Sequence, residues 1–177
     1  MRKIICFLLK LLGFYLLWLL CDNYWDKFVW FKRIWYYPQY GLLKEIIFFS
    51  TSILSKGFLL NVQIVDINKF LIEGREIIEI GAPCFGHELM YFFSVFIISY
   101  PGQWKRKIYY ILFGCFLINY LNILRIVGLS FIFLYFPQYA DFNHHFLFTF
   151  IIYTVVFSMW LVWIRYFSNE EQTDVKT

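Results

Sequence analysis

The sequence predicts an all-α polytopic membrane protein with about four transmembrane helices, an interfacial amphipathic helix and a small outward β-hairpin. Its composition is the main reason. Hydrophobic residues make up 61% of the 177 residues, aromatic residues 25% and charged residues only 16%. Ordinary soluble domains contain about 45–50% apolar and about 25% charged residues. So few charges cannot cover a small soluble domain, and a net charge of +4 does not fit a nucleic-acid-binding domain.

Four apolar stretches are the candidate transmembrane helices. Residues 4–20 follow a basic start and contain one charge, and no signal-peptide cleavage site follows them, so we expect a retained first helix. Residues 87–100 form the second candidate, with polar groups only at its start. Residues 108–134 and 146–164 meet the length requirement, because about twenty apolar residues span the hydrocarbon core of a bilayer.

Three segments of different character lie between the first two candidates. Residues 24–41 interleave Trp and Tyr with basic residues, which is typical of a membrane interface. Residues 42–60 carry three charges and fit either an amphipathic helix at the interface or a strained span. Residues 62–80 alternate β-branched and polar residues around Gly74, which predicts two short strands and a turn.

The loop charges predict the orientation in the membrane. Residues 101–107 contain three basic residues and no acid, so we expect them in the cytoplasm. Residues 135–145 lack Lys and Arg, and residues 61–83 carry two basic and four acidic residues (2 − 4 = −2), so both are expected outside. The C-terminus is then cytoplasmic, as is the basic N-terminus. An even number of spans is required, and four spans in one integral membrane domain over 1–177 satisfy it.

Three polar features stand out from this apolar background. Arg125, in the predicted span 108–134, is expected to face the bundle interior, with Asn122 one turn away. Cys84 lies at the outer start of a predicted helix, where backbone N–H groups and the helix dipole lower the pKa of a thiol. His144 and His145 lie in an outward loop at the same membrane face. A thiolate, a cation and an imidazole are the parts of a cysteine acyl-transfer site.

The order of these residues resembles a known family. Pro83-Cys84-x-Gly86, then Asn122-Ile123-Leu124-Arg125-Ile126, then Asp141-Phe142-Asn143-His144 resembles the exosortase/archaeosortase family of membrane-embedded cysteine transpeptidases. The short length and the flanking stretches (PGQWKRK, NILRIVGLS and FNHH with a closing W-x-x-W) look most like the exosortase X/F-type proteins of Bacteroidetes. The resemblance covers about residues 78–167, which is half of the chain.

The resemblance implies a catalytic triad of Cys84 as nucleophile, Arg125 as oxyanion stabiliser and His144 as general acid and base. It implies a cysteine peptidase or transpeptidase that processes C-terminal hydrophobic sorting signals of exported proteins. The reaction would take place at the periplasmic face of the bacterial cytoplasmic (inner) membrane. The implied partners are the exported substrate and the lipid bilayer. No nucleic acid, cofactor or metal is expected, and hydrolysis and transfer both remain open.

The neighbours of these residues leave the assignment of the base open. Gly86 is part of the motif, but His87 follows it directly where we would expect an apolar residue. His87 and His145 are therefore alternatives to His144. Glu88, one turn after the predicted nucleophile, could orient His87 or His144, and it fits an ordinary interfacial carboxylate equally well.

Two other function classes are consistent with parts of the sequence. In the first, the chain is a non-enzymatic membrane assembly subunit whose Arg125 and Asn122 dock a partner helix. In the second, it is an intramembrane metalloprotease, which the absence of an HExxH motif disfavours. The substitution Cys84→Ser separates the leading class from the assembly subunit, because only an enzyme of this type needs the thiol.

Overall fold

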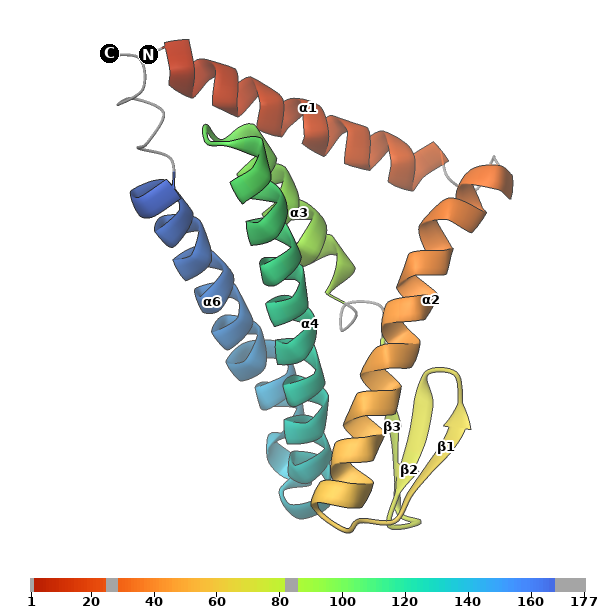
Figure 1. Ribbon diagram of the computed structural model, residues 1–177. Helices are drawn as coiled ribbons and strands as arrows, with labels where there is room; N and C mark the ends of the chain where they lie inside the picture. The colour runs from red at the N-terminus through yellow and green to blue at the C-terminus, as the bar shows by residue number, and fades with distance from the viewer. Residues whose placement is uncertain (1, 25–28, 82–85, 168–177) are drawn as a thin grey trace. The chain divides into compact units, whose positions relative to one another are not determined.

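The computed structural model describes residues 2–24, 29–81 and 86–167 (Figure 1). In this part of the chain, helices predominate and one small antiparallel sheet is present. The chain divides into two compact units. The first comprises Met1–Tyr37, Glu88–Cys115 and Val156–Thr177, and the second comprises Pro38–His87 and Phe116–Val155.

Five longer helices are joined or extended by short helical turns. The longer helices are α1 (Arg2–Tyr24), α2 (Val29–Ser52), α3 (His87–Ser99), α4 (Trp104–Tyr135) and α6 (Phe148–Val162). The turns are η2 (Ile53–Gly57), η4 (Pro137–Tyr139), α5 (Ala140–Phe142), η5 (Asn143–Leu147) and η6 (Trp163–Phe167). Pro101 follows the end of α3 and Pro137 follows the end of α4, because proline lacks the N–H that would continue the preceding helix.

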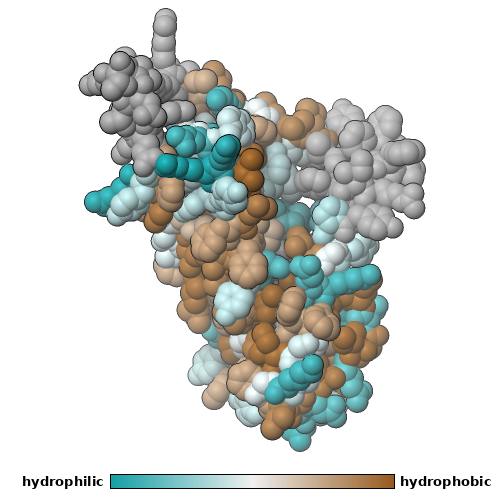
Figure 2. Space-filling view, in the orientation of Figure 1, coloured by the Kyte–Doolittle hydropathy of each residue, from teal (hydrophilic) through white to brown (hydrophobic). Residues whose placement is uncertain are grey.

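Within residues 2–24, 29–81 and 86–167, two helical segments are long and apolar enough to cross a membrane. They are Trp104–Tyr135 and Pro137–Phe167, and they confirm the predictions at 108–134 and 146–164 as long apolar helices. Apolar residues cover broad areas of the visible face in Figure 2. The predicted second span, α3, has 13 residues, which at 1.5 Å per residue is about 20 Å and shorter than the ~30 Å hydrocarbon core. Two candidate spans are therefore present among the described residues, and the other two predicted spans are not confirmed.

The segment predicted to start at residue 42 belongs to a longer helix. α2 begins at Val29 and continues through Pro38 to Ser52, so the boundary predicted near residue 41 is wrong. The amphipathic pattern is real, because Leu43, Ile46 and Ile47 are buried at helical spacing. Their partners are other parts of the protein, since these side chains belong to the main hydrophobic cluster of the second unit.

The segment 62–80 forms three strands where two were predicted. β1 (Val62–Asp66), β2 (Lys69–Ile72) and β3 (Glu76–Glu79) pair antiparallel in the order β1-β2-β3. The predicted turn around Gly74 joins β2 to β3, and both Glu73 and Gly74 have positive φ (53° and 66°), as a type I′ turn requires. An additional reversal follows Asp66, whose carboxylate Oδ1 accepts a hydrogen bond from the backbone N–H of Ile67 at 2.6 Å. This local hydrogen bond favours a turn, so the segment that the sequence predicts as one strand is divided into β1 and β2.

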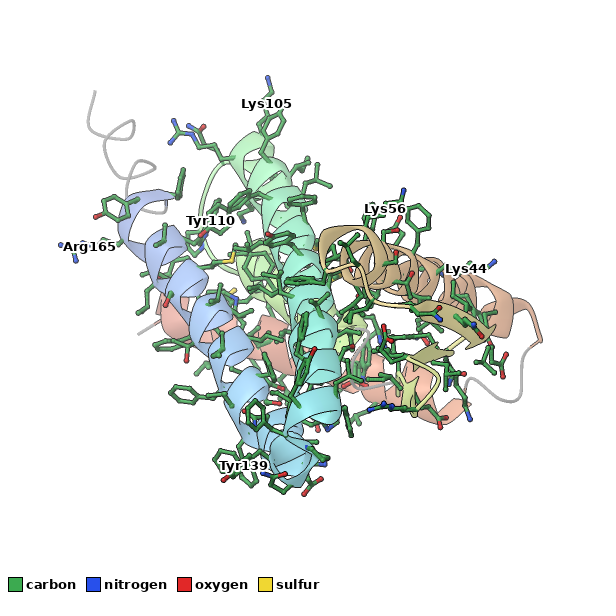
Figure 3. All side chains as sticks on the ribbon, turned by 90° about the horizontal axis from the view of Figure 1, so that it is seen from below. Lys44, Lys56, Lys105, Tyr110, Tyr139 and Arg165 are labelled. Carbon is green, nitrogen blue, oxygen red and sulfur yellow. The ribbon has the colours of Figure 1, made fainter. Side chains whose placement is uncertain are left out.

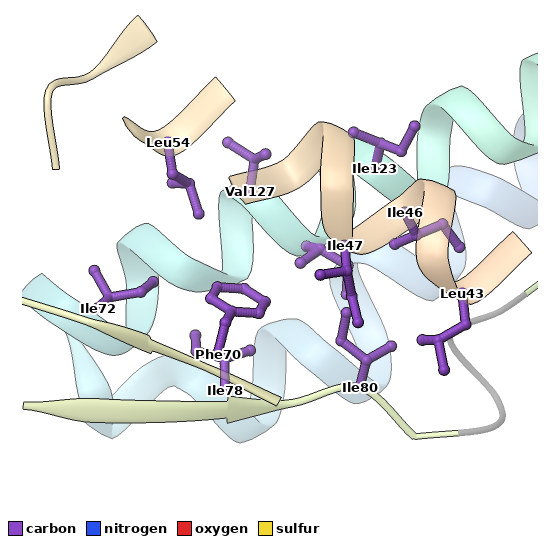
Figure 4. Close-up of a cluster of buried hydrophobic side chains, with 11 residues drawn as sticks. Leu43, Ile46, Ile47, Leu54, Phe70, Ile72, Ile78, Ile80, Ile123 and Val127 are labelled. Atoms are coloured by element: carbon purple, nitrogen blue, oxygen red, sulfur yellow. The ribbon is translucent and has the colours of Figure 1, made fainter. Parts of the chain in front are cut away.

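The sheet, α2 and α4 enclose the core of the second unit (Figure 4). Phe70 and Ile72 alternate with less buried residues along β2 and point into the core. Ile123 and Val127 of α4 are buried in the same cluster. The packing of these side chains fixes how α4 is rotated about its axis. It therefore also fixes the directions in which the other residues of α4, including Asn122 and Arg125, point.

Aromatic side chains hold the first unit together. The ring centroids of Trp18 and Tyr91 lie 4.6 Å apart, which joins α1 to α3. Tyr110 of α4 lies against α6, where its hydroxyl donates to the carbonyl of Met159 at 2.8 Å (Figure 3). The ring of Tyr110 also contacts Trp163, with 5.0 Å between centroids. The ring planes are tilted by 40° in the first pair and by 49° in the second, and aromatic pairs can add about 0.5–1.5 kcal/mol each to the burial of apolar area.

Candidate functional site

Most of the predicted site residues belong to the second unit. Gly86, Asn122, Arg125 and His144 all lie in it. Cys84, the predicted nucleophile, lies outside the residues that the structure describes. Glu88 is exposed and belongs to the first unit. The described part of the site therefore consists of α4 and the two segments that contact it, at Gly86 and at His144.

Arg125 is buried inside the second unit, with only 7% of its surface exposed. Its Nη2 donates to the backbone carbonyl of His144 at 3.0 Å. Its Nε is buried and has no hydrogen-bond partner among the described residues. An unused buried donor costs about 1–3 kcal/mol. A buried guanidinium with a donor to spare is suited to bind a carbonyl oxygen or an anion.

Asn122 lies one turn before Arg125 on α4 and is 2% exposed. Its amide Nδ2 is also buried without a hydrogen-bond partner in the described part of the chain. Residues at i and i+3 share one side of a helix. Asn122 and Arg125 thus place two unused buried N–H donors on one side of α4. Such a pair of donors is the chemical requirement for stabilising an oxyanion.

Gly86 packs directly against Asn122. It has φ +67°, in the left-handed region, and a Cβ built at this position would collide with the Asn122 amide and lie 3.4 Å from Ile118 Cγ2. Only glycine meets both the conformational and the spatial requirement. The sequence motif that contains Gly86 is therefore in contact with the motif that contains Asn122.

The contact between Gly86 and Asn122 predicts the effect of a single methyl group. Gly86→Ala should lower the free energy of unfolding by about 1–2 kcal/mol for the positive φ, and by about 1–3 kcal/mol more because Asn122 must move. Gly74→Ala is the matched control, because Gly74 has φ +66° and no atom within 4 Å of its added Cβ. Denaturant unfolding of the detergent-solubilised protein measures both.

A double substitution isolates the steric part of that effect. Gly86→Ala combined with Asn122→Ala should recover most of the extra destabilisation, since the colliding amide is gone. Equal unfolding free energies for the Gly86→Ala and Gly74→Ala variants would contradict the close approach of Asn122.

The two adjacent histidines occupy different environments. His144 is half-buried, and its backbone carbonyl accepts hydrogen bonds from Arg125 Nη2 and from Thr149 Oγ1, the latter at 3.3 Å. The His145 side chain is 61% exposed, and its Nε2 lies 3.3 Å from Asp141 Oδ1. Arg125 thus contacts the backbone of His144. The sequence alone predicts only that the two residues lie at a similar depth in the membrane.

The alternative base, His87, is half-buried at the first position of α3 and belongs to the second unit. It directly follows Gly86, so the Gly86–Asn122 contact also brings the backbone of His87 close to α4. His87 and His145 both stay alternatives to His144, and of the three only the His145 side chain is exposed.

Sequence reasoning missed several contacts around the site. Thr149 bonds the His144 carbonyl, and Glu45 of α2 accepts from Asn119 at a long 3.5 Å. Residues Asn143–Leu147 form a π-helical turn, a rare feature that occurs often at functional sites. The sequence carries no signal for a π-helical turn, so neither this turn nor its hydrogen bonds could be predicted.

Comparison with protein-family models, with curated proteins and with solved structures finds no match for the chain. The geometry of the second unit and the sequence motifs are therefore the basis for a functional proposal.

Proposed function

We propose that this protein is a membrane-embedded cysteine peptidase or transpeptidase that processes C-terminal sorting signals of exported proteins. One observation carries the proposal. Asn122 and Arg125 hold two unused buried N–H donors on one side of α4, in contact with Gly86 and with the backbone of His144. Gly86, α4 and His144, one described part from each segment that resembles the exosortase/archaeosortase family, are thus linked by these contacts.

The covalent chain limits how far the nucleophile can be from these donors. Cys84 precedes Gly86 by two residues, and two residues span at most about 7 Å. Gly86 packs on Asn122, and the proposal requires the Cys84 thiol to attack a carbonyl group bound to the donors of Asn122 and Arg125, which this chain length permits. This reach is what a nucleophile beside an oxyanion site needs.

The proposed reaction proceeds in two steps. The Cys84 thiolate adds to the scissile carbonyl carbon, and the resulting oxyanion accepts hydrogen bonds from Arg125 Nε and Asn122 Nδ2. The intermediate then expels the amine as the C–N bond breaks, and the His144 imidazolium supplies its proton. Water or an acceptor amine attacks the thioester, loses its proton to His144 and releases Cys84. Water gives hydrolysis, and an amine gives transpeptidation.

The membrane part of the proposal extends the two candidate spans to four. In this arrangement α1 and α3 also insert, the loop 101–107 and the C-terminus face the cytoplasm, and the site faces the periplasm of a bacterial inner membrane. An exposed apolar row on α4 consists of Phe116, Tyr120 and Leu124. It belongs to the same unit as the site and offers a surface for the hydrophobic tail of the substrate.

A second candidate function rests on the other bond of Arg125. The hydrogen bond from Nη2 to the carbonyl of His144 joins α4 to the turn η5, as expected if Arg125 and Asn122 only hold helices together in a non-enzymatic assembly subunit. A guanidinium bound to a carbonyl is a common solution for a buried arginine in a membrane protein. In that case the Cys84 thiol has no function.

Thiol reactivity distinguishes the two functions without knowledge of the substrate. In the proposed enzyme, Cys84 should react with iodoacetamide near pH 6.5 about tenfold faster than Cys115, because a helix N-terminus and a nearby guanidinium favour the thiolate. Peptide mass spectrometry after timed labelling measures both rates. Cys115 is the internal reference, since its Sγ lies 3.8 Å from Ser94 Oγ in the partly buried interior.

Two controls complete the labelling experiment. Cys84→Ser should remove the fast reaction and leave the labelling of Cys115 unchanged. A membrane-impermeant maleimide applied outside intact cells should also label Cys84. Labelling only after the membranes are opened would contradict the outward site. Labelling of Cys84 no faster than Cys115 would contradict the enzyme and favour the assembly subunit.

A further inference from the structure

A polar cavity of about 280 Å³ lies in the first unit, between α1 and the loop that joins α3 to α4. Its lining includes Lys10 of α1, Ser99 at the end of α3, and Gln103, Trp104 and Lys107. The cavity contains none of the residues of the proposed peptidase site. It is smaller than a typical drug-sized pocket of about 300–1,000 Å³, so it suits a small polar group.

Local packing forms this cavity. Phe7 of α1 contacts the ring of Tyr100, with 5.4 Å between centroids. Lys10 follows one turn later on the same side of α1, which brings it to the cavity. Gly102 has φ +146°, and a Cβ there would lie 2.9 Å from Trp163. Glycine thus allows the loop, which lines the cavity, to pass close to Trp163.

The side chains of this cavity are those of an anion site. Ser99 is 5% exposed, lines the cavity, and its hydroxyl has no hydrogen-bond partner among the described residues. Lys107 is also 5% exposed. Its Nζ donates to the Ile98 carbonyl at 3.0 Å and lies 5.0 Å from the centre of the Trp104 ring. A buried ammonium group, an exposed lysine and an unused hydroxyl together favour a ligand with negatively charged oxygens.

The surrounding charge has the same sign. Among the residues of the first unit whose side chains are described, five are basic and one is acidic. The acidic residue, Glu88, lies at the start of α3, whereas the cavity lies at the end of that helix. Lys105 and Arg106 belong to the same turn of α4 as Lys107. An anion in the cavity therefore meets a positive potential.

We propose that this cavity binds the phosphate group of an anionic phospholipid. Trp104, which lines the cavity, and Ile108, which follows Lys107 in the chain, are exposed. They belong to α4, which starts there and is long and apolar enough to span a membrane. A headgroup in the cavity would leave its acyl chains along that apolar helix. Tryptophan and lysine at the end of such a helix are typical of the headgroup level. This inference is independent of the proposed peptidase activity.

Native mass spectrometry of the full chain in detergent tests the inference. The probes are phosphatidylglycerol, phosphatidylcholine with the same acyl chains, and inorganic phosphate. The wild-type chain should retain phosphatidylglycerol more tightly than phosphatidylcholine, whose choline cation faces the lysines. Lys10→Gln should weaken phosphatidylglycerol binding about fivefold. Lys10→Gln with Ser99→Ala should weaken it at least about tenfold.

The matched control is Lys44→Gln with Ser50→Ala in the second unit. Lys44 is exposed, and the Ser50 hydroxyl is buried without a partner among the described residues, so the control removes the same groups elsewhere. It should bind phosphatidylglycerol as the wild type does. Ser99 is buried, so the Ser99→Ala change can impair folding. Lys10 is exposed, so the Lys10→Gln variant should fold normally and still tests lipid binding.

Three results would overturn the inference. The first is equal retention of phosphatidylglycerol by the wild type and both Lys10 variants. The second is an equal loss in the control, which would indicate attraction by net charge alone. The third is binding of inorganic phosphate as tight as that of phosphatidylglycerol, which would indicate that the ligand is a soluble phosphate compound and not a lipid. None of these measurements depends on Cys84, so they leave the test of the peptidase unaffected.

Discussion

Replacing His144 by alanine is expected to lower the cleavage of a co-expressed exported protein by about 10²- to 10⁴-fold, the usual contribution of a general acid and base. The substrate is an exported protein that ends in a short motif, a hydrophobic helix and a basic tail. The measurement is the fraction of this protein that loses its tail, read as a mass shift on a gel. Cys84→Ala provides the inactive reference.

The neighbouring histidine provides the matched control. His145→Ala should leave cleavage nearly intact, because the His145 side chain is 61% exposed and pairs with Asp141. If His145→Ala abolishes cleavage and His144→Ala does not, the base is His145. A loss only in His87→Ala would assign the role to the residue after Gly86. Normal rates in all three variants would rule out a histidine base and the triad with it.

Replacing Arg125 by leucine should lower cleavage by about 10²- to 10³-fold, the effect of losing one oxyanion donor. Arg125→Lys should also lose most of the activity, because lysine keeps the charge without the planar group of donors. Ser130→Ala is the control, since Ser130 is a buried residue of α4 whose hydroxyl donates to the Ile126 carbonyl of its own helix at 2.8 Å. The control should cleave normally.

Arg125 also stabilises the fold, so cleavage and thermal unfolding are measured on the same variants. Loss of the bond to the His144 carbonyl predicts some destabilisation in Arg125→Leu. If the protein is the proposed enzyme, the Arg125→Lys variant loses cleavage activity even when it is fully folded. An active Arg125→Leu variant, or cleavage that falls only in proportion to the folded fraction, would favour the assembly subunit.

The fold could be predicted from the sequence where a single local signal decides the structure. Long apolar runs, with Arg125 as the one charged residue within them, predicted the two long apolar helices, and Gly74 marked the turn between β2 and β3. The start of α2 at Val29 could not be predicted, because an aromatic and basic segment is compatible with helix or interface loop alike. The third strand depends on a hydrogen bond within Asp66-Ile67, which competes with continued extension of the strand.

The site was predictable in its residue types and not in its contacts. Arg125 stood out because a charge within an apolar run has to be accommodated, and its burial agrees with that reasoning. Its acceptor is a backbone carbonyl. Every residue has such a carbonyl, so the sequence does not indicate which one Arg125 contacts. The same holds for Gly86, whose contact with Asn122 depends on the packing of two segments far apart in the chain.

The position of the sheet in the chain has a consequence for biosynthesis. Phe70, Ile72 and Ile78 need both α2 and α4 to cover them. The ribosome completes α2 before the sheet, but Ile123 follows roughly forty residues after β3, which takes several seconds at about 5–20 residues per second. During that interval the part of the apolar sheet face that α4 covers is uncovered. We expect a nascent chain that ends before α4 to be recognised by chaperones, and the sheet to become protease-resistant only when α4 has emerged.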